Sequence, residues 1–267
     1  MTFDKNFIII SIEKEKEVIM MSYYATSDLH GNYYLWNKIK NFLKKDDVLF
    51  YLGDACDRGK DGIQIMQELL KDKRVTYLLG NHELMFLNAI KTQTDDNWYN
   101  IQHNEMLWLY NGGKPTYEQW HQLSKDEQTA LKIKIASLPI YATYKGENHN
   151  VVLCHSGLSS EQLLLEMNKN SSKDMDLYIW NREHIQEEKW CLSNSLKNIY
   201  IVHGHTPVCV LNQFNYTIKD NQDDKVYKYC DGHKIDIDMG TYATNTACLL
   251  DLDTLEAVYF KEEKKDE

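Results

Sequence analysis

The chain has 267 residues, of which 43% are hydrophobic and 26% are charged, an ordinary composition for a soluble globular protein. This length is sufficient to bury a substantial core. The net charge of −10 argues against nonspecific binding to nucleic acid, which requires a basic surface.

The N-terminal segment does not look like a signal peptide. The apolar patch 7–12 is followed by the charged run 13–17, and no small-residue cleavage site follows, so we do not interpret it as a signal peptide. No apolar run approaches the roughly 20 residues that span a bilayer. We expect residues 1–20 to be a dispensable extension, residues 21–260 to be a single domain, and residues 261–267 to be a charged tail.

The six cysteines contain no Cys-x-x-Cys pair, so a zinc ribbon or a thioredoxin-like motif is not indicated. A reducing cytosol fits this cysteine usage best. We therefore expect a cytoplasmic protein without a membrane partner, and a monomer.

The first third of the chain alternates between two kinds of pattern. Three short apolar runs predict buried strands, and they lie at 23–26, 48–52 and 75–79. A segment with apolar residues at helical spacing follows each run, and these segments lie at 35–43, 63–70 and 82–90. Alternating strands and helices of this kind predict an α/β fold that begins with a parallel sheet.

The middle of the chain is predicted to be helical. A helix is expected at 98–109, and Asn111-Gly112-Gly113-Lys114-Pro115 marks a break after it. Ser124 and Glu127 form a capping-box signature at the start of the next helix, which Pro139 ends.

The last half of the chain shifts towards strands. The runs 140–144 and 151–154 predict a hairpin, and 199–202 predicts another buried strand. A polar helical stretch is expected at 160–194. Short apolar runs that follow the same strand-rich pattern lie at 208–211, 226–229, 234–238, 246–252 and 256–260.

Polar blocks follow the first three strands. They are Asp28-Leu29-His30-Gly31, Gly53-Asp54-Ala55-Cys56-Asp57-Arg58-Gly59 and Gly80-Asn81-His82-Glu83. Ligands of α/β sheets gather at the carboxyl ends of the strands, which is where these blocks lie. Carboxylate, imidazole and amide oxygen together suit divalent metals such as manganese, iron or zinc. These blocks therefore predict a two-metal site.

The order of these motifs resembles that of the calcineurin-like metallophosphoesterases. Within them it is most similar to the phosphoprotein phosphatase branch and to the bacterial and lambda-phage-type serine/threonine phosphatases. The resemblance implies a central β-sandwich flanked by helices, with two metals at the strand carboxyl ends. Two later blocks agree with it, Cys154-His155-Ser156-Gly157 and His203-Gly204-His205-Thr206-Pro207.

Mapped onto this chain, the resemblance implies a ligand set for two divalent cations, manganese first and iron or zinc as alternatives. Metal 1 would be held by Asp28, His30 and Asp54, and metal 2 by Asp54, Asn81, His155 and His205. His203 lies two residues before His205 and either reaches the site or is a strand-end histidine.

The remaining roles follow from residue type. Water between two cations becomes a hydroxide at neutral pH and would attack phosphorus directly. His82 would be the general acid for the leaving alkoxide, and Asp57 would orient its imidazole. Arg58 and Arg182, the latter in Trp180-Asn181-Arg182-Glu183, would grip the phosphoryl oxygens.

Three functions compete on this pattern. The leading prediction is a metal-dependent protein serine/threonine phosphatase acting on a phosphorylated protein or peptide, with phosphotyrosine as a poorer substrate. The alternative is hydrolysis of diadenosine tetraphosphate and related dinucleoside polyphosphates. Leu79 favours the alternative, since the resembling phosphatases usually carry arginine there, whereas Asp57 favours the phosphatase. A non-catalytic phosphate-binding scaffold would predict eroded ligands, and none is seen.

Overall fold

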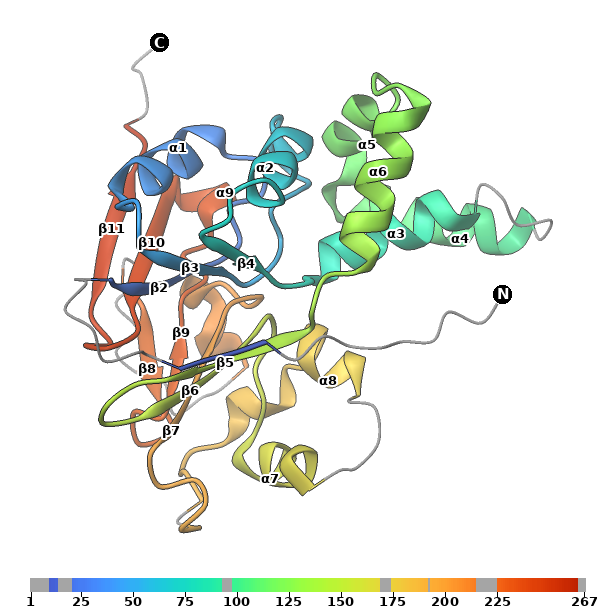
Figure 1. Cartoon of the computed structure of the whole chain (residues 1–267). Helices are drawn as coiled ribbons and strands as arrows, with labels where there is room; N and C mark the ends of the chain where they lie inside the picture. Colours follow the sequence, from blue (N-terminus) through green and yellow to red (C-terminus); the bar gives the residue numbers. More distant parts are fainter. Residues whose placement is uncertain are drawn as a thin grey trace.

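The structure, a computed structural model, describes residues 10–13, 21–92, 98–168, 174–191, 193–214 and 225–263. Within these residues the chain forms two β-sheets with helices on their outer faces (Figure 1). The predicted α/β class and the central β-sandwich flanked by helices are confirmed.

The first sheet has five strands in the order β11-β10-β2-β3-β4. The three predicted strands of the first third are β2 (Tyr23–Thr26), β3 (Val48–Tyr51) and β4 (Val75–Tyr77), and they are parallel to one another. The strands β10 (Thr246–Asp251) and β11 (Ala257–Lys261) extend the sheet in antiparallel fashion beside β2.

The second sheet has six strands in the order β1-β5-β6-β7-β9-β8. Their bounds are Ile10–Glu13 for β1, Tyr141–Lys145 for β5, Asn150–Cys154 for β6, Ile199–His203 for β7, Tyr227–Tyr229 for β8 and Lys234–Asp236 for β9. The predicted hairpin is the antiparallel pair β5–β6. β1 comes from the segment that we expected to be dispensable, and it pairs with β5 in parallel.

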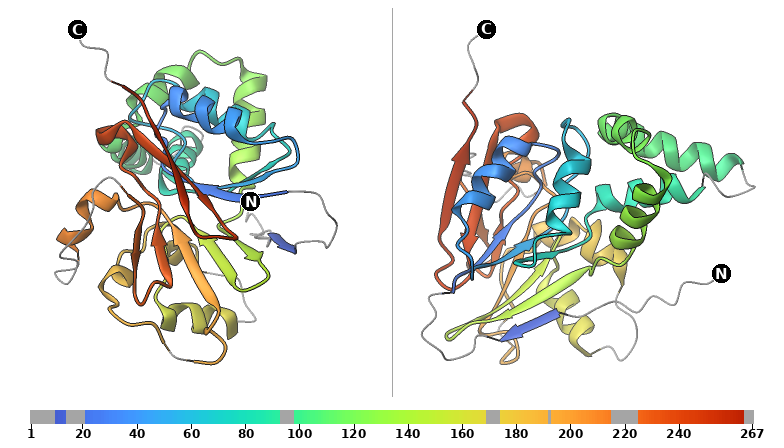
Figure 2. Two further views of the ribbon diagram at one scale, coloured as in Figure 1. Left: turned by 90° about the vertical axis from the view of Figure 1, so that its left-hand side faces the viewer. Right: turned by 45° about the horizontal axis from the view of Figure 1, so that its top comes forward.

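Helices cover the outer faces of both sheets (Figures 1 and 2). Their bounds are Tyr33–Phe42 for α1, Gly62–Leu69 for α2, Asn81–Thr92 for α3, Trp98–Trp108 for α4, Lys114–Trp120 for α5, Lys125–Ala136 for α6, Ser160–Asn168 for α7, Met175–Ile179 for α8 and Thr241–Thr244 for α9. The predicted capping box is present, because Ser124 and Glu127 exchange both of its hydrogen bonds at the start of α6. In Figure 1, α4 projects away from the sheets, while α7 and α8 lie beside the second sheet.

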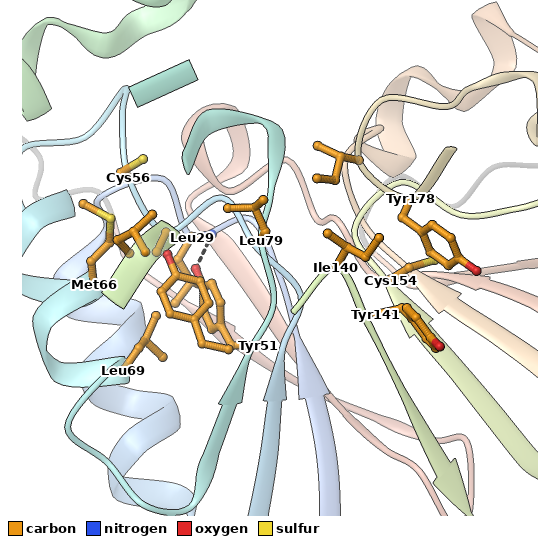
Figure 3. Close-up of a cluster of buried hydrophobic side chains, with 14 of the residues drawn as sticks. Leu29, Tyr51, Cys56, Met66, Leu69, Leu79, Ile140, Tyr141, Cys154 and Tyr178 are labelled. Atoms are coloured by element: carbon orange, nitrogen blue, oxygen red, sulfur yellow. Dashed lines mark hydrogen bonds between the residues drawn. The ribbon is translucent and has the colours of Figure 1, made fainter. Parts of the chain in front are cut away.

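The two sheets pack through one hydrophobic cluster, and their outer faces contribute to another. Phe50 and Leu153 belong to the cluster between the sheets, whereas their strand neighbours Tyr51 and Cys154 belong to the outer cluster. This division follows from the alternation of side chains along a strand. In Figure 3 the outer cluster includes Tyr51 beside α2, where its hydroxyl accepts the N–H of Leu29 at 3.2 Å.

Several predictions about elements need correction. The run 208–211, expected as a strand, lies in a 3₁₀ helix, Val208–Gln213, which begins directly after Pro207. The predicted break at 111–115 is confirmed, because it coincides with a π-helical turn, Leu109–Gly113, in which Gly112 has a φ of 95°. The stretch 160–194 is interrupted, and its residues 169–173 and 192 lie outside the described residues.

The predicted charged tail differs at its first residue, because Lys261 is the last residue of β11. Glu262 is tied to the domain by a hydrogen bond of 2.9 Å from the side-chain amide of Asn32. Residues 264–267 lie outside the described residues.

Candidate active site

The candidate site lies where loops leave the carboxyl ends of strands β2, β3, β4, β6 and β7. Backbone hydrogen bonds tie these loops to one another. The N–H of His30 donates to the carbonyl of Asp54 at 3.0 Å, and the N–H of Gly204 donates to the carbonyl of His155 at 2.8 Å. Residues that are far apart in sequence are therefore held in one place by the backbone before any side chain contributes.

Two glycines allow this close approach. A Cβ on Gly80 would lie 2.6 Å from Oε2 of Glu83 and against the carboxylate of Asp54. A Cβ on Gly204 would collide with the side chains of Asp28 and Ser27. These positions accept only glycine without displacing a candidate ligand.

Six non-glycine residues of the site adopt positive φ angles, in the left-handed region. They are Asp28 (54°), His30 (44°), Asp54 (58°), Asp57 (68°), Arg58 (61°) and His205 (71°). This region is uncommon for non-glycine residues, and such strain gathers at functional sites.

The first group of candidate ligands consists of electron-pair donors that face one another. His30 directs Nδ1 towards the carbonyl of Cys56 at 3.0 Å, which places the proton on Nδ1 and a lone pair on Nε2. That Nε2 lies 3.9 Å from Oδ1 of Asp28 and 3.7 Å from Oδ2 of Asp54. Oδ1 of Asp28 is buried and has no hydrogen-bond partner.

The second group repeats this arrangement on the other side of Asp54. His155 directs Nδ1 towards the carbonyl of Leu52 at 2.8 Å, so its Nε2 carries a lone pair. That Nε2 lies 2.9 Å from Oδ1 of Asn81, 3.2 Å from Nδ1 of His205 and 3.5 Å from Oδ1 of Asp54. Nδ1 of His205 is itself 2.8 Å from Oδ1 of Asn81.

Burial adjusts the protonation states in a direction that favours metal binding. Burial lowers the pKa values of His30, His155 and His205, so their imidazoles stay neutral and can act as ligands. Burial also raises the pKa of Asp54, and the charges of Asp28 and Glu83 add to this effect. A cation beside Asp54 would reverse that rise.

The donor set therefore fits two divalent cations, for which Asp54 would be a ligand common to both groups. Acceptor atoms this close together repel one another unless a cation lies between them. The six predicted metal-binding residues are all present in these two groups.

The four predicted catalytic residues lie beside the same groups. Nδ1 of His82 is 2.7 Å from Oδ2 of Asp57, and both side chains are buried. Nε2 of His82 lies 3.2 Å from a terminal guanidinium nitrogen of Arg58. Nε of Arg182 donates a hydrogen bond of 3.2 Å to the hydroxyl oxygen of Thr206. The negative charges of Asp54 and Asp28 also attract its guanidinium.

Burial alone would lower the pKa of His82, but the charges of Asp54 and Asp57 and the hydrogen bond to Asp57 outweigh it. The pKa of His82 therefore lies above its ordinary value. His82 also lies within 4.8 Å of ligand atoms of His30 and Asp54. Its bond to Asp57 and its contact with Arg58 set it apart from the candidate ligands.

Several supporting residues were not predicted. Glu83 accepts four hydrogen bonds beneath the site, and Ser27 donates to the carboxylate of Asp28. Asp238 is buried, and burial together with the nearby charge of Asp28 raises its pKa. Trp108 and Thr116 contact Asp57. Glu83 could have been found from its place in the Gly-Asn-His-Glu block, whereas Trp108 and Thr116 stand in no motif that we had used.

His203 does not join either group of ligands. Its Nδ1 contacts the carbonyl of Gly204 at 3.1 Å, and its Nε2 contacts the hydroxyl of Tyr229 at 2.8 Å. The same hydroxyl contacts Nδ1 of His184 at 2.9 Å. The structure thus favours the interpretation of His203 as a buried strand-end histidine.

A cleft of about 480 Å³ adjoins His30. Its walls include the half-exposed rings of Tyr34 and Tyr242 and the side chains of Asn37 and Lys60.

Comparison with known proteins agrees with this geometry. A model of the family described as calcineurin-like phosphoesterase matches residues 21–237. Serine/threonine-protein phosphatase 2 of Salmonella typhimurium is 26% identical over 165 residues, which cover 61% of this chain and 68% of that protein. The symmetrical bis(5'-nucleosyl)-tetraphosphatase of Wigglesworthia glossinidia brevipalpis is 23% identical over 220 residues, which cover 78% of this chain and 74% of that protein.

The fold is also similar to that of solved structures. A protein serine/threonine phosphatase from Saccharomyces cerevisiae gives a TM-score of 0.57 at 13% identity, covering 97% of this chain and 85% of that chain. Among the residues that the structure describes, no helix is both long enough and apolar enough to cross a membrane.

Proposed function

We propose that this chain, which belongs to the calcineurin-like phosphoesterase family and hydrolyses phosphoric ester bonds, is a protein serine/threonine phosphatase. Its substrate would be a phosphorylated protein or peptide, and it would act as a monomer. The relatives named above include both protein phosphatases and dinucleoside tetraphosphatases, so the choice between the two rests on the chemistry of the site.

The observation that carries the proposal is the buried pair of Asp57 and His82, with 2.7 Å between carboxylate oxygen and Nδ1. Serine and threonine leave a phosphate as alkoxides, which are strong bases and need a proton as the bond to phosphorus breaks. A nucleotide leaves as a phosphate anion that is already stable. A general acid held this firmly by a buried carboxylate therefore favours an alkyl phosphate as substrate.

Arg58 links phosphate binding to this acid. Its guanidinium lies 3.2 Å from Nε2 of His82, the atom that would donate the proton. Phosphoryl oxygens compete for the guanidinium, because a charged bidentate pair is stronger than its single contact with the imidazole of His82. Substrate binding would draw Arg58 onto the phosphate and expose Nε2 of His82. Nε2 would then take up a proton from solvent, which the raised pKa of His82 favours, and donate it to the leaving oxygen. Arg182 would hold the phosphate from the side of Thr206.

The cations that we propose are manganese, held by Asp28, His30 and Asp54 at one position and by Asp54, Asn81, His155 and His205 at the other. Oxygen ligands mixed with imidazole suit manganese, and iron or zinc would fit the same atoms. When bound, two such ions lower the pKa of a coordinated water and offset the charge of the phosphoryl group.

The test compares substrates whose leaving groups differ. The purified protein, stripped of metal and reloaded with manganese, would be assayed on a phosphothreonine peptide, 4-nitrophenyl phosphate and diadenosine tetraphosphate. We expect efficient manganese-dependent cleavage of the peptide. We expect His82→Asn to lower kcat on the peptide by about 10²–10⁴-fold, the usual contribution of a general acid, and to affect 4-nitrophenyl phosphate much less. Absence of peptide cleavage by an enzyme that hydrolyses 4-nitrophenyl phosphate would refute the proposal.

The second candidate is hydrolysis of dinucleoside polyphosphates, and the cleft beside His30 favours it. Two half-exposed tyrosine rings and an asparagine in one cleft offer stacking and hydrogen bonding to a nucleobase. Leu79 carries less weight than its position suggested, because it is buried in the outer hydrophobic cluster shown in Figure 3. Cleavage of diadenosine tetraphosphate without cleavage of the peptide would establish this candidate.

A further inference from the structure

Three hydrogen bonds tie the loop of Asp57 and Arg58 to a single segment, 108–116, at the base of the projecting helix α4. The N–H of Asp57 donates to the hydroxyl oxygen of Thr116 at 2.8 Å. The N–H of Arg58 donates to the carbonyl of Gly112 at 2.8 Å. Both Asp57 and Arg58 have positive φ angles, so these bonds secure a backbone that would otherwise relax.

The third tie reaches the carboxylate itself. Nε1 of Trp108 lies 3.0 Å from Oδ1 and 2.9 Å from Oδ2 of Asp57. Among the described residues, the indole is the only side-chain donor to Oδ1, while Oδ2 also faces Nδ1 of His82. An N–H shared by both oxygens fixes the rotation of the carboxylate about its Cβ–Cγ bond, with Oδ2 directed at the imidazole.

Packing holds the indole in place. Trp108 is 1% exposed, and its ring centroid lies 5.4 Å from that of Phe86 in α3. A Cβ on Gly113 would lie 2.5 Å from Nε1 of Trp108, so the turn after α4 closes directly over the indole. The indole can therefore act as a rigid support for the carboxylate.

We infer that Trp108 is a positioning residue for the general acid: it sets the orientation of Asp57, and through Asp57 that of His82. This inference rests on the proposed role of His82 as the acid for an alkoxide leaving group. Trp108 contacts neither the candidate metal ligands nor the phosphate-gripping arginines in the hydrogen bonds described, so its effect must pass through Asp57. Thr116 supports the same residue from the backbone side.

This role predicts an effect that depends on the leaving group. Trp108→Phe retains a buried aromatic ring against Phe86 but removes the donor to Asp57. The imidazole would then sample orientations that do not meet the leaving oxygen. Substrates that need the proton would suffer, whereas those with a weakly basic leaving group would not.

Trp120 provides a matched control. It is also buried, at 5% exposure, and its ring lies 5.1 Å from that of Phe86, yet no hydrogen bond joins it to Asp57. Trp120→Phe therefore also removes a buried indole that packs against Phe86, but it leaves the contacts of Asp57 and His82 unchanged.

The experiment measures kcat on a phosphothreonine peptide and on 4-nitrophenyl phosphate for the manganese-loaded wild type and for Trp108→Phe, Trp120→Phe, Asp57→Asn and His82→Asn. We expect Trp108→Phe to lose about tenfold on the peptide, as for a hydrogen bond to a charged group, and less than about twofold on 4-nitrophenyl phosphate. Thr116→Val, which removes the acceptor of the Asp57 N–H, should show the same selectivity. Trp120→Phe should lose less than about twofold on both.

The outcomes separate the inference from the function on which it rests. If Asp57→Asn and His82→Asn lose activity equally on both substrates, the proposed general acid is wrong. If these two variants are selective but Trp108→Phe is not, the positioning role of Trp108 is wrong. Thermal melting of each variant shows whether it is folded. Should Trp108→Phe fail to fold, the selectivity of Trp108→Leu, which also lacks the N–H donor to Asp57, decides the inference.

Discussion

The hydrogen bonds that converge on Glu83 allow a quantitative prediction. Its carboxylate is fully buried, and four donors surround it. Oε2 accepts the N–H of Asp54 at 2.8 Å and that of Gly80 at 3.0 Å. Oε1 accepts the N–H of Ala55 and the hydroxyl of Tyr77, both at 2.8 Å. Glu83 thus fixes the backbone that carries Asp54, the candidate ligand common to both metal positions.

Glu83→Gln exchanges one of these oxygens for an NH₂ group of the same size. With the amide oxygen at the position of Oε2, the bonds from Asp54 and Gly80 remain. The NH₂ group then faces the N–H of Ala55, which loses its acceptor, while the hydroxyl of Tyr77 can rotate and accept. A buried donor without a partner costs about 1–3 kcal/mol, and bonds to a charged acceptor are worth about 1.5–3 kcal/mol. We expect the free energy of unfolding to fall by about 3 kcal/mol.

The assay is guanidinium unfolding of the metal-free protein at pH 7, followed by circular dichroism, so that metal binding does not contribute to stability. Tyr77→Phe is the control, because it removes one donor and leaves the carboxylate intact, and we expect it to cost about 1 kcal/mol. A loss of unfolding free energy below about 0.5 kcal/mol for Glu83→Gln, or one no larger than that of Tyr77→Phe, would show that the four hydrogen bonds to Glu83 do not stabilise the fold as we expect.

Three further predictions test other parts of the structure. His155→Ala removes one candidate ligand of the second metal. We expect this variant to bind about one ion per chain where the wild type binds two, as measured by plasma mass spectrometry after gel filtration. An unchanged ratio of metal to protein would contradict the ligand set. Gly112→Ala places a Cβ 2.9 Å from Cγ of Arg58 at a φ of 95°, and it should lower the unfolding free energy by about 1–2 kcal/mol, whereas an unchanged melting curve would show that the turn relaxes freely. Burial would raise the pKa of Glu68, but hydrogen bonds from Lys40 and two aromatic side chains lower it from 4.5 to about 2. Its contribution to stability is therefore present above pH 4.5 and is lost as the pH falls towards 2, so the stability difference between wild type and Glu68→Gln should shrink over that interval; a constant difference would refute the assignment.

The parts of the site that follow strands could be predicted from the sequence because their signals are local. An apolar run that ends in a polar block identifies a strand and the loop after it, and loops of this kind meet at one edge of a sheet. Asp28, Asp54 and Asn81 were found in this way, and the motif order then pointed to His155 and His205. The capping box at Ser124 is local for the same reason.

The parts that could not be predicted depend on contacts between distant segments. Trp108 and Asp57 are separated by 51 residues, and nothing in the composition of α4 marks one tryptophan as a partner for a carboxylate. The run 208–211 has the apolar character of a strand, but Pro207 precedes it and it coils into a 3₁₀ helix. β1 could not be anticipated because it forms only by pairing with β5, a segment distant in sequence, and the charged residues that follow it gave no sign of this pairing.

The positive φ angles of the site have a consequence for how this protein can evolve. Each such angle in a non-glycine residue opposes folding by about 1–3 kcal/mol unless its surroundings hold it, and Asp28, Asp54, Asp57, Arg58 and His205 all adopt one. Glycine at these positions would relieve the strain and remove a functional group in the same step. Selection for stability alone would therefore favour loss of the site, and inactive descendants with a sturdier fold would arise readily by single substitutions.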